Sequence, residues 1–288
     1  MGRYAEDIVK RMVFVRYISA PFGLCLTELQ NPYLLHIGLT FTSMHDRYLA
    51  NQSHMRRSSF ECYHWAAGSR LFECELSQVP KACDMDAIWT AAFLMSWITW
   101  YDVETQNPEE VFPLAPATLS SIQWFPMHQG LCTIWRIFEP EIPNIQITKP
   151  TPSISERCVG LATPPPGIVG IPQALIDLCE LDESSNAEDN PYHSAVHTLS
   201  SLLQNSGGNP NTLRFLAFVN TMEPAFEGLL RQRDPKSLVL MALWYAIVPK
   251  SAWWISLRAS LERRAICIYL DRFHADNVII HAAMALVQ

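Results

Sequence analysis

The stretch from Ala87 to Tyr101 constrains the fold more than any other part of the sequence. Its 15 residues are almost all apolar, with only Thr and Ser as polar interruptions. A helix that crosses a membrane needs about 20 such residues, so this stretch is too short to span a bilayer. A helix that is apolar nearly all round must be covered by other elements on every side. We therefore expect a buried, central helix over residues 87–101.

Helical patterns flank this stretch on both sides, because apolar residues recur there at intervals of three and four. Before it, we expect an antiparallel pair of helices over 33–48 and 58–76. After it, we expect a helix over 119–138 that is kinked or restarted at Pro126. The apolar face of the 58–76 helix is expected to consist of Phe60, Tyr63, Ala67, Leu71 and Cys74.

The last third of the chain carries the most regular pattern. We expect a short helix before Glu180 and another from about Pro191. Three long helices are then expected over 212–231, 235–248 and 252–273, separated by short breaks at Arg233-Asp234-Pro235 and Pro249-Lys250. Short breaks make consecutive helices antiparallel neighbours, which favours a bundle.

Prolines mark the long connections between these helices. Eight of the 20 prolines lie within residues 140–172, and an acidic, polar segment follows over 180–190. With only 11 glycines and few alternating β-branched runs, a sheet is disfavoured. We expect an all-α fold in one bundle-like domain over 1–288, with N-terminal helices in 1–138, connectors in 139–190 and C-terminal helices in 191–288.

Charge and cysteine usage limit the class of function. The formal net charge is -7, whereas proteins that grip DNA alone present clustered Lys and Arg. We therefore expect no direct DNA contact by this chain. The eight cysteines are spread singly, as reduced thiols are in intracellular proteins. The first residues lack the apolar core of a secretory signal, so we expect an intracellular protein of the cytoplasm or nucleus, without a membrane span.

Several segments together resemble one known family. They are Asn31 to His36 with Met44-His45, Tyr63 to Leu76, Ser121 to Trp124 with Gly130, Met222-Glu223-Pro224, Asp234 to Leu238, Trp253 to Ile255, and Ala259 to Leu270. These segments resemble the C-terminal effector domain of the zinc binuclear cluster transcription regulators of fungi, in the subgroup similar to the sterol uptake control proteins.

The resemblance implies a helical regulatory domain that responds to a small hydrophobic, sterol- or isoprenoid-like ligand. The family's DNA-binding module, six cysteines in two CxxC-led clusters, has no counterpart here because no two cysteines lie closer than nine residues apart. We therefore expect no metal and no cofactor, and the sequence leaves a homodimer open.

Tryptophans are the candidate ligand-binding residues. They could wall an apolar cavity, or they could fill a large helical core, and the sequence leaves both interpretations open. The candidates lie in the most apolar helices: Trp97, Trp100, Trp244, Trp253 and Trp254.

The sequence favours a protein without enzymatic activity, and an enzyme is the alternative interpretation. Carboxylates that follow an aromatic helix could hold Mg²⁺ and an isoprenoid diphosphate, as in class I terpene cyclases of fungal secondary metabolism. The residues for this reading are Asp102, Glu104, Asn220 and Arg258, but the usual aspartate-rich motif is absent. A third interpretation is a protein that dimerises with full-length regulators through exposed helices.

Two smaller patterns carry weaker chemistry. His193 and His197 have the spacing of a metal-binding pair, but a solvated helix start capped by Asp189 or Asn190 explains them as well. Arginines gather near the C-terminal helices and could grip an anion, although a solvated face paired with acidic residues is the more ordinary interpretation. These arginines are Arg231, Arg233, Arg258, Arg263 and Arg264.

Overall fold

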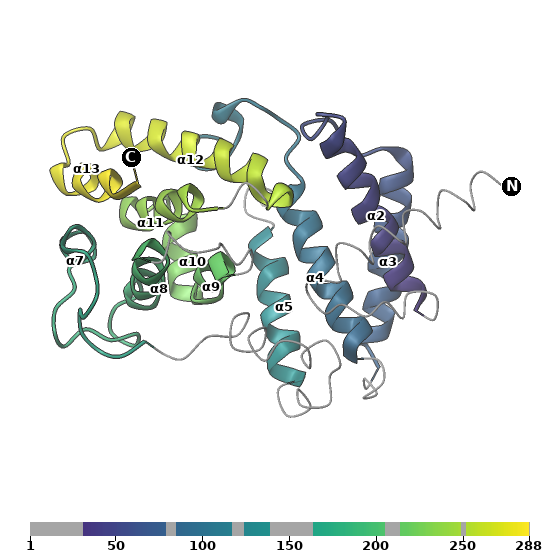
Figure 1. Cartoon of the computed structure of the whole chain (residues 1–288), viewed down its shortest axis with the longest axis horizontal. Coiled ribbons are helices and arrows are strands. Elements are labelled where there is room, and N and C mark those ends of the chain that lie inside the picture. The colour runs from purple at the N-terminus through teal and green to yellow at the C-terminus, as the bar shows by residue number, and fades with distance from the viewer. Residues whose placement is uncertain are drawn as a thin grey trace, which may run out of the picture. The chain divides into compact units, whose positions relative to one another are not determined.

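A computed structural model of the chain describes residues 31–78, 85–116, 124–138, 164–204, 214–248 and 252–287. All regular secondary structure within these ranges is helical, as predicted (Figure 1). The chain divides into two compact units. Unit 1 comprises Met1–Glu104 and Gln123–Glu156, and unit 2 comprises Thr105–Ile122 and Arg157–Gln288. The expectation of a single domain over 1–288 stays a prediction.

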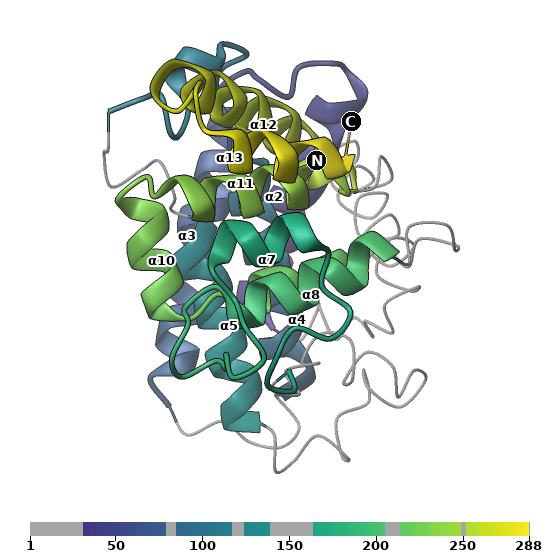
Figure 2. The same cartoon turned by 90° about the vertical axis from the view of Figure 1, so that its left-hand side faces the viewer.

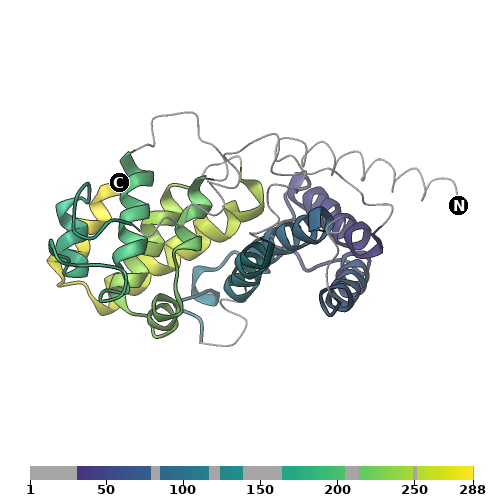
Figure 3. The same ribbon diagram turned by 90° about the horizontal axis from the view of Figure 1, so that it is seen from below.

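Unit 1 is built around one buried helix. Its described helices are α2 (Pro32–Leu49), α3 (Ser59–Leu76), α4 (Met85–Tyr101) and α5 (Trp124–Phe138). Helix α2 packs against α3 and α4, and α4 packs against α5. Seen from below, α4 lies between α5 and the α2–α3 pair (Figure 3). Every residue from Ala87 to Ile98 is buried, which confirms the central helix that the apolar stretch predicts.

The predicted apolar face of α3 is wrong. Tyr63 is 65% exposed and Cys74 is exposed, while the buried residues of this helix are Glu61, His64, Gly68 and Phe72. Two of these inward residues are polar and one is Gly, so hydrophobic spacing could not identify the face. At Gly68 the backbone of α3 lies so close to α2 that an added Cβ would meet Ile37 Cγ1 at 2.9 Å.

Polar contacts satisfy the two buried polar residues of α3. Arg47 of α2 donates from Nε to Glu61 at 3.0 Å, and Nδ1 of His36 lies 2.7 Å from Nδ1 of His64. Glu61 also accepts from the backbone N–H of Ser58, whose side chain accepts from the N–H of Glu61. This reciprocal capping box satisfies backbone N–H groups at the start of α3 that have no partner within the helix.

Unit 2 is also built around one buried helix, α11 (Pro235–Ala246). Every residue of α11 from Ser237 to Tyr245 is buried. Helix α11 packs against α8, α10, α12 and α13 (Figure 2). The other described helices of this unit are η3 (Pro108–Glu110), α7 (Gln173–Cys179), α8 (His193–Gln204), η6 (Arg214–Leu216), α9 (Ala217–Asn220), α10 (Pro224–Arg231), α12 (Trp253–Phe273), α13 (Val278–Met284) and η7 (Ala285–Val287).

Three features of the helices differ from the prediction. The expected helix over 212–231 is broken into η6, α9 and α10, because Pro224 has no N–H to donate and starts α10 instead. Helix α5 runs through Pro126 without a restart, since a proline in the first turn of a helix removes no intrahelical hydrogen bond. Helix α13 has no counterpart in the prediction.

The break before α11 agrees with the sequence. Arg233 has a positive φ of 59°, and the side chain of Asp234 accepts from the backbone N–H of Ser237 at the start of the helix. The expected break at Pro249-Lys250 and most of the connector over 140–172 lie outside the described residues. Within the described parts of the chain, no helix combines the length and apolar character that crossing a membrane requires.

Candidate functional site

A pocket of about 370 Å³ lies in unit 1 between α3, α4 and α5 and is partly open to solvent. Cavities that hold small molecules are typically about 300–1,000 Å³ and mainly apolar. This pocket is of that kind, since most of its lining side chains are hydrocarbon or thioether groups. Its lining consists of Ser69, Phe72, Glu73, Leu76, Ser77, Ala92, Met95, Met127, Gly130, Leu131 and Ile134.

Helical periodicity places these residues on facing stripes. On α3 the lining residues are 69, 72, 73 and 76, and on α5 they are 127, 130, 131 and 134. Both sets follow the spacing i, i+3, i+4, i+7, which puts them on one face of a helix. Ala92 and Met95 come from α4, the helix against which α5 packs. Because the main packing partner of α3 is α2, its stripe stays available to line the space between α3 and α5.

Small and adaptable side chains keep the pocket open. A Cβ added at Gly130 would have no heavy atom within 4 Å, so the position faces empty space. Met95 and Met127 line the same space, and the unbranched thioether side chain of Met adapts to differently shaped partners. Gly130 lines the pocket and is exposed, so a larger side chain there would narrow the pocket where it is open to solvent without displacing the helices around it.

Ser69 differs from several other hydroxyls in or next to the described helices. Its Oγ is buried and has no hydrogen-bond partner among the described residues. Hydroxyls inside helices usually donate to the carbonyl four residues earlier. That bond is made by Thr40, Ser77, Thr90, Thr133 and Ser200. A buried hydroxyl left without a partner favours a ligand that supplies one, because leaving such a group unsatisfied costs about 1–3 kcal/mol.

The candidate tryptophans of unit 1 lie in its aromatic core and not in this pocket. Trp97 is 2% exposed, with its ring centroid 4.6 Å from that of Phe93 and 5.8 Å from that of Phe41. Trp100 is fully buried and stacks on Trp124 of α5 with centroids 3.9 Å apart. These contacts fasten α4 to α2 and α5.

Unit 2 holds the other three candidates. Trp244 is fully buried, and its Nε1 donates to the carbonyl of Phe215 at 2.8 Å. Trp254 is 2% exposed and stacks on the ring of Phe215, while Trp253 is half-buried. The five tryptophans are thus divided between the two units. Their role as the wall of one cavity stays a prediction.

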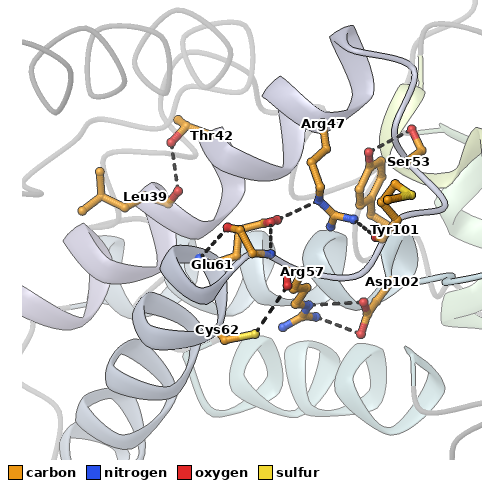
Figure 4. A network of polar contacts seen from close by, with 11 residues as sticks. Leu39, Thr42, Arg47, Ser53, Arg57, Glu61, Cys62, Tyr101 and Asp102 are labelled. Atoms are coloured by element: carbon orange, nitrogen blue, oxygen red, sulfur yellow. Dashed lines mark hydrogen bonds and ion pairs between the residues drawn. The ribbon is translucent and has the colours of Figure 1, made fainter.

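The two carboxylates of the alternative enzyme hypothesis form ion pairs with arginines. Asp102 forms an ion pair of 2.9 Å with Arg57, as Figure 4 shows, and Glu104 forms an exposed pair of 3.5 Å with Arg56. In the same region Arg47 contacts Glu61, and Tyr101 donates to Ser53 at 2.9 Å. These contacts tie the α2–α3 connection to the end of α4, so a magnesium ion would have to displace an arginine to reach Asp102.

The other two residues of that reading belong to unit 2. Arg258 is buried and pairs with Glu262, which also accepts from the hydroxyl of Tyr245 at 2.6 Å. Burial raises the pKa of Glu262, and Arg258 opposes this shift. Asn220 ends α9 and is half-buried. Within the described parts of the chain, no group of three His, Cys, Asp or Glu side chains could hold a metal ion.

The first histidine of the α8 pair, His193, is buried and not solvated. His193 is 0% exposed, and its ring lies 4.5 Å from that of His197, centroid to centroid. Burial lowers the pKa of His193. Nε2 of His197 lies 2.9 Å from the carbonyl of Gly167, so this ring ties α8 to the preceding connection. The side chain of Asn190 accepts from the backbone N–H of Tyr192 just before the helix, as a capping side chain does, whereas the burial of His193 contradicts the expected solvated start.

Three of the five candidate arginines have individual partners. Arg231 pairs with Glu227 one turn earlier, and Arg233 donates to the carbonyl of Ala115 at 2.8 Å. Arg258 pairs with Glu262 as the acidic partner that the sequence predicts, but this pair is buried and does not belong to a solvated face.

Hydrophobic spacing alone could not identify the pocket, because its α3 stripe includes Ser69 and Glu73 and its α5 stripe includes Gly130. The i, i+3, i+4, i+7 spacing over 127–134 does indicate that these residues share one face of a helix, but it does not indicate that a pocket lies beside that face. Comparison with known proteins gives no match: no family model, no curated protein and no solved structure is similar to this chain.

Proposed function

We propose that this chain is the ligand-sensing, regulatory domain of a fungal transcription regulator. In this proposal it binds a small hydrophobic molecule, sterol-like or isoprenoid-like, in the pocket between α3, α4 and α5. The observation that carries the proposal is the apolar pocket of about 370 Å³ with open space at Gly130. The resemblance of the sequence to the effector domains of fungal zinc-cluster regulators supplies the regulatory context.

Burial of apolar surface supplies the affinity in this proposal. Each Å² of apolar surface removed from water contributes roughly 25 cal/mol, and the side chains of Phe72, Leu131 and Ile134 offer such surface. Part of that energy is offset by the lost freedom of the ligand, so contact quality decides the affinity. The net charge of -7 fits a chain that senses a ligand and leaves DNA contact to another part of the regulator.

Regulation requires that the ligand bind one conformation better than another. A ligand in the pocket touches α3 and α5 together, whereas the protein's own packing joins α3 chiefly to α2. The bound molecule therefore favours the arrangement in which α3 and α5 are held at the spacing of the pocket. Binding also stabilises the folded state in proportion to the logarithm of the ligand concentration.

Native mass spectrometry of the purified chain tests the proposal. The chain is mixed with a fungal lipid extract in one sample, and with isoprenoid diphosphates and Mg²⁺ in another. We expect a retained, unmodified lipid in the first sample. Loss of diphosphate with release of a hydrocarbon in the second sample would instead make the chain an enzyme and refute the proposal.

A variant that fills the pocket links retention to this site. Gly130→Leu places an isobutyl group in the open space, and Gly130→Ala is the matched control because it leaves most of the volume empty. Both changes favour the helix, since Gly is the poorer helix former by about 1 kcal/mol. We expect Gly130→Ala to keep the lipid and Gly130→Leu to lose it. Equal retention by both variants would place the lipid elsewhere and contradict the proposal.

A further inference from the structure

The described residues that line the pocket include one charged side chain, and it is acidic. Glu73 lies four residues after Ser69 on α3, so both face the same side of the helix. Glu73 is exposed at the rim, whereas the hydroxyl oxygen of Ser69 is buried. Among the described residues, no Lys, Arg or His lines the pocket. A ligand therefore meets an apolar space, one buried hydroxyl and one carboxylate.

The carboxylate of Glu73 forms no ion pair within the described residues. This sets it apart from Glu61, Asp102 and Glu104 of the same unit, each of which pairs with an arginine. An unpaired carboxylate at the mouth of a pocket attracts a cation and repels an anion, more strongly where apolar walls limit the access of water.

We propose that Ser69 and Glu73 set the charge selectivity of this pocket. The ligand has an apolar body and a polar end that is an amine or a hydroxyl, and ligands that end in a carboxylate or a phosphate are rejected. Ser69 forms a hydrogen bond with the polar end, and Glu73 attracts a positive charge or accepts a hydrogen bond from a hydroxyl. This selectivity rests on the proposed function, since it requires that the pocket bind a small molecule.

Three probes with the same ten-carbon apolar chain test the selectivity: decylamine, 1-decanol and undecanoate. Their affinities for the full chain are measured by displacement of an environment-sensitive dye at pH 7. We expect the order amine, alcohol, carboxylate. Exposed ion pairs contribute up to about 1 kcal/mol, roughly a factor of five, so attraction and repulsion together give at most about a 25-fold preference for amine over carboxylate, and we expect about tenfold.

Variants assign the selectivity to the two side chains. Glu73→Gln should bring the amine-to-carboxylate ratio close to one and leave the affinity for 1-decanol nearly unchanged. Glu75→Gln is the matched control, because it removes a neighbouring carboxylate of α3 that does not line the pocket. Ser69→Ala should weaken binding of 1-decanol about threefold to tenfold, as expected for one lost hydrogen bond.

The outcomes separate this inference from the proposed function. If no probe binds, or if Gly130→Leu leaves all three affinities unchanged, the pocket is not a ligand site and both proposals fail. If the probes bind in the pocket with equal affinity, the selectivity is wrong while the proposed function stands. An equal change in Glu75→Gln and Glu73→Gln would trace the preference to the overall charge of the chain and overturn the assignment to Glu73.

Discussion

The ion pair between Arg47 and Glu61 gives a prediction for the stability of unit 1. The two side chains are 13% and 2% exposed, and Nε of Arg47 lies 3.0 Å from Glu61. Removal of one member of a buried pair costs about 3–5 kcal/mol, because the other charge stays buried without its partner. Glu61→Ala also removes half of the capping box, which contributes roughly 0.5–2 kcal/mol.

Two features of Arg47 place the expected value near the lower end of this range. Its guanidinium also donates to the carbonyl of Met55, and its residual exposure admits water. We therefore expect Glu61→Ala to lower the free energy of unfolding by about 3 kcal/mol. Glu104→Ala is the control, because its pair with Arg56 is exposed and its loss should change stability by less than about 1 kcal/mol.

Equilibrium unfolding in urea, followed by circular dichroism and tryptophan fluorescence, measures both changes. The double variant Arg47→Met with Glu61→Leu replaces the whole pair by apolar groups and should recover much of the lost stability, since no charge is left unpaired. If the double variant is as unstable as Glu61→Ala, the loss comes from packing. If Glu61→Ala and Glu104→Ala unfold at the same urea concentration, the reasoning from burial is refuted.

Two further predictions concern the glycines and the histidine pair of unit 1. In Gly68→Ala the new Cβ meets Ile37 Cγ1 at 2.9 Å, so thermal unfolding should show a loss of about 1–3 kcal/mol in the free energy of unfolding. Gly130→Ala should leave this free energy unchanged or raise it. A change of the same sign in both variants would contradict the packing described at these two sites. Burial lowers the pKa of His64 below its ordinary value of 6.5, so its contribution to stability is complete above about pH 6.5 and is lost as pH falls through the lowered pKa. The urea midpoint should therefore fall between pH 7 and pH 5 less steeply in His64→Gln than in the native chain, and an unchanged slope would exclude His64 as a source.

The sequence predicts helices well where apolar residues dominate and poorly where the inward face is polar. The stretch over 87–101 gives α4 because nearly every side chain in it needs cover, and α11 is buried in the same way. The face of α3 is misassigned because its inward residues Glu61, His64 and Gly68 act through a salt bridge, a hydrogen bond and close backbone contact. None of these has a hydrophobic signature.

The candidate site shows the same limit. Trp97 and Trp244 are easy to single out as large aromatic residues, and the structure places both in cores where they pack against other rings. The pocket instead depends on the absence of a side chain at Gly130 and on the distance between α3 and α5. Both are features of the packing between helices. A single sequence predicts the stripe of one helix but not the space that two stripes enclose.

Photoaffinity mapping tests the central claim most directly. An alkyl diazirine probe with a hydroxyl end is bound to the full chain and irradiated, and the labelled peptides are identified by mass spectrometry. We predict labels on the stripes that line the pocket, within residues 69–77 and 127–134, and their loss in Gly130→Leu. Labels concentrated around Trp244 and Trp254 of unit 2, or labels unchanged in Gly130→Leu, would contradict a ligand site between α3, α4 and α5.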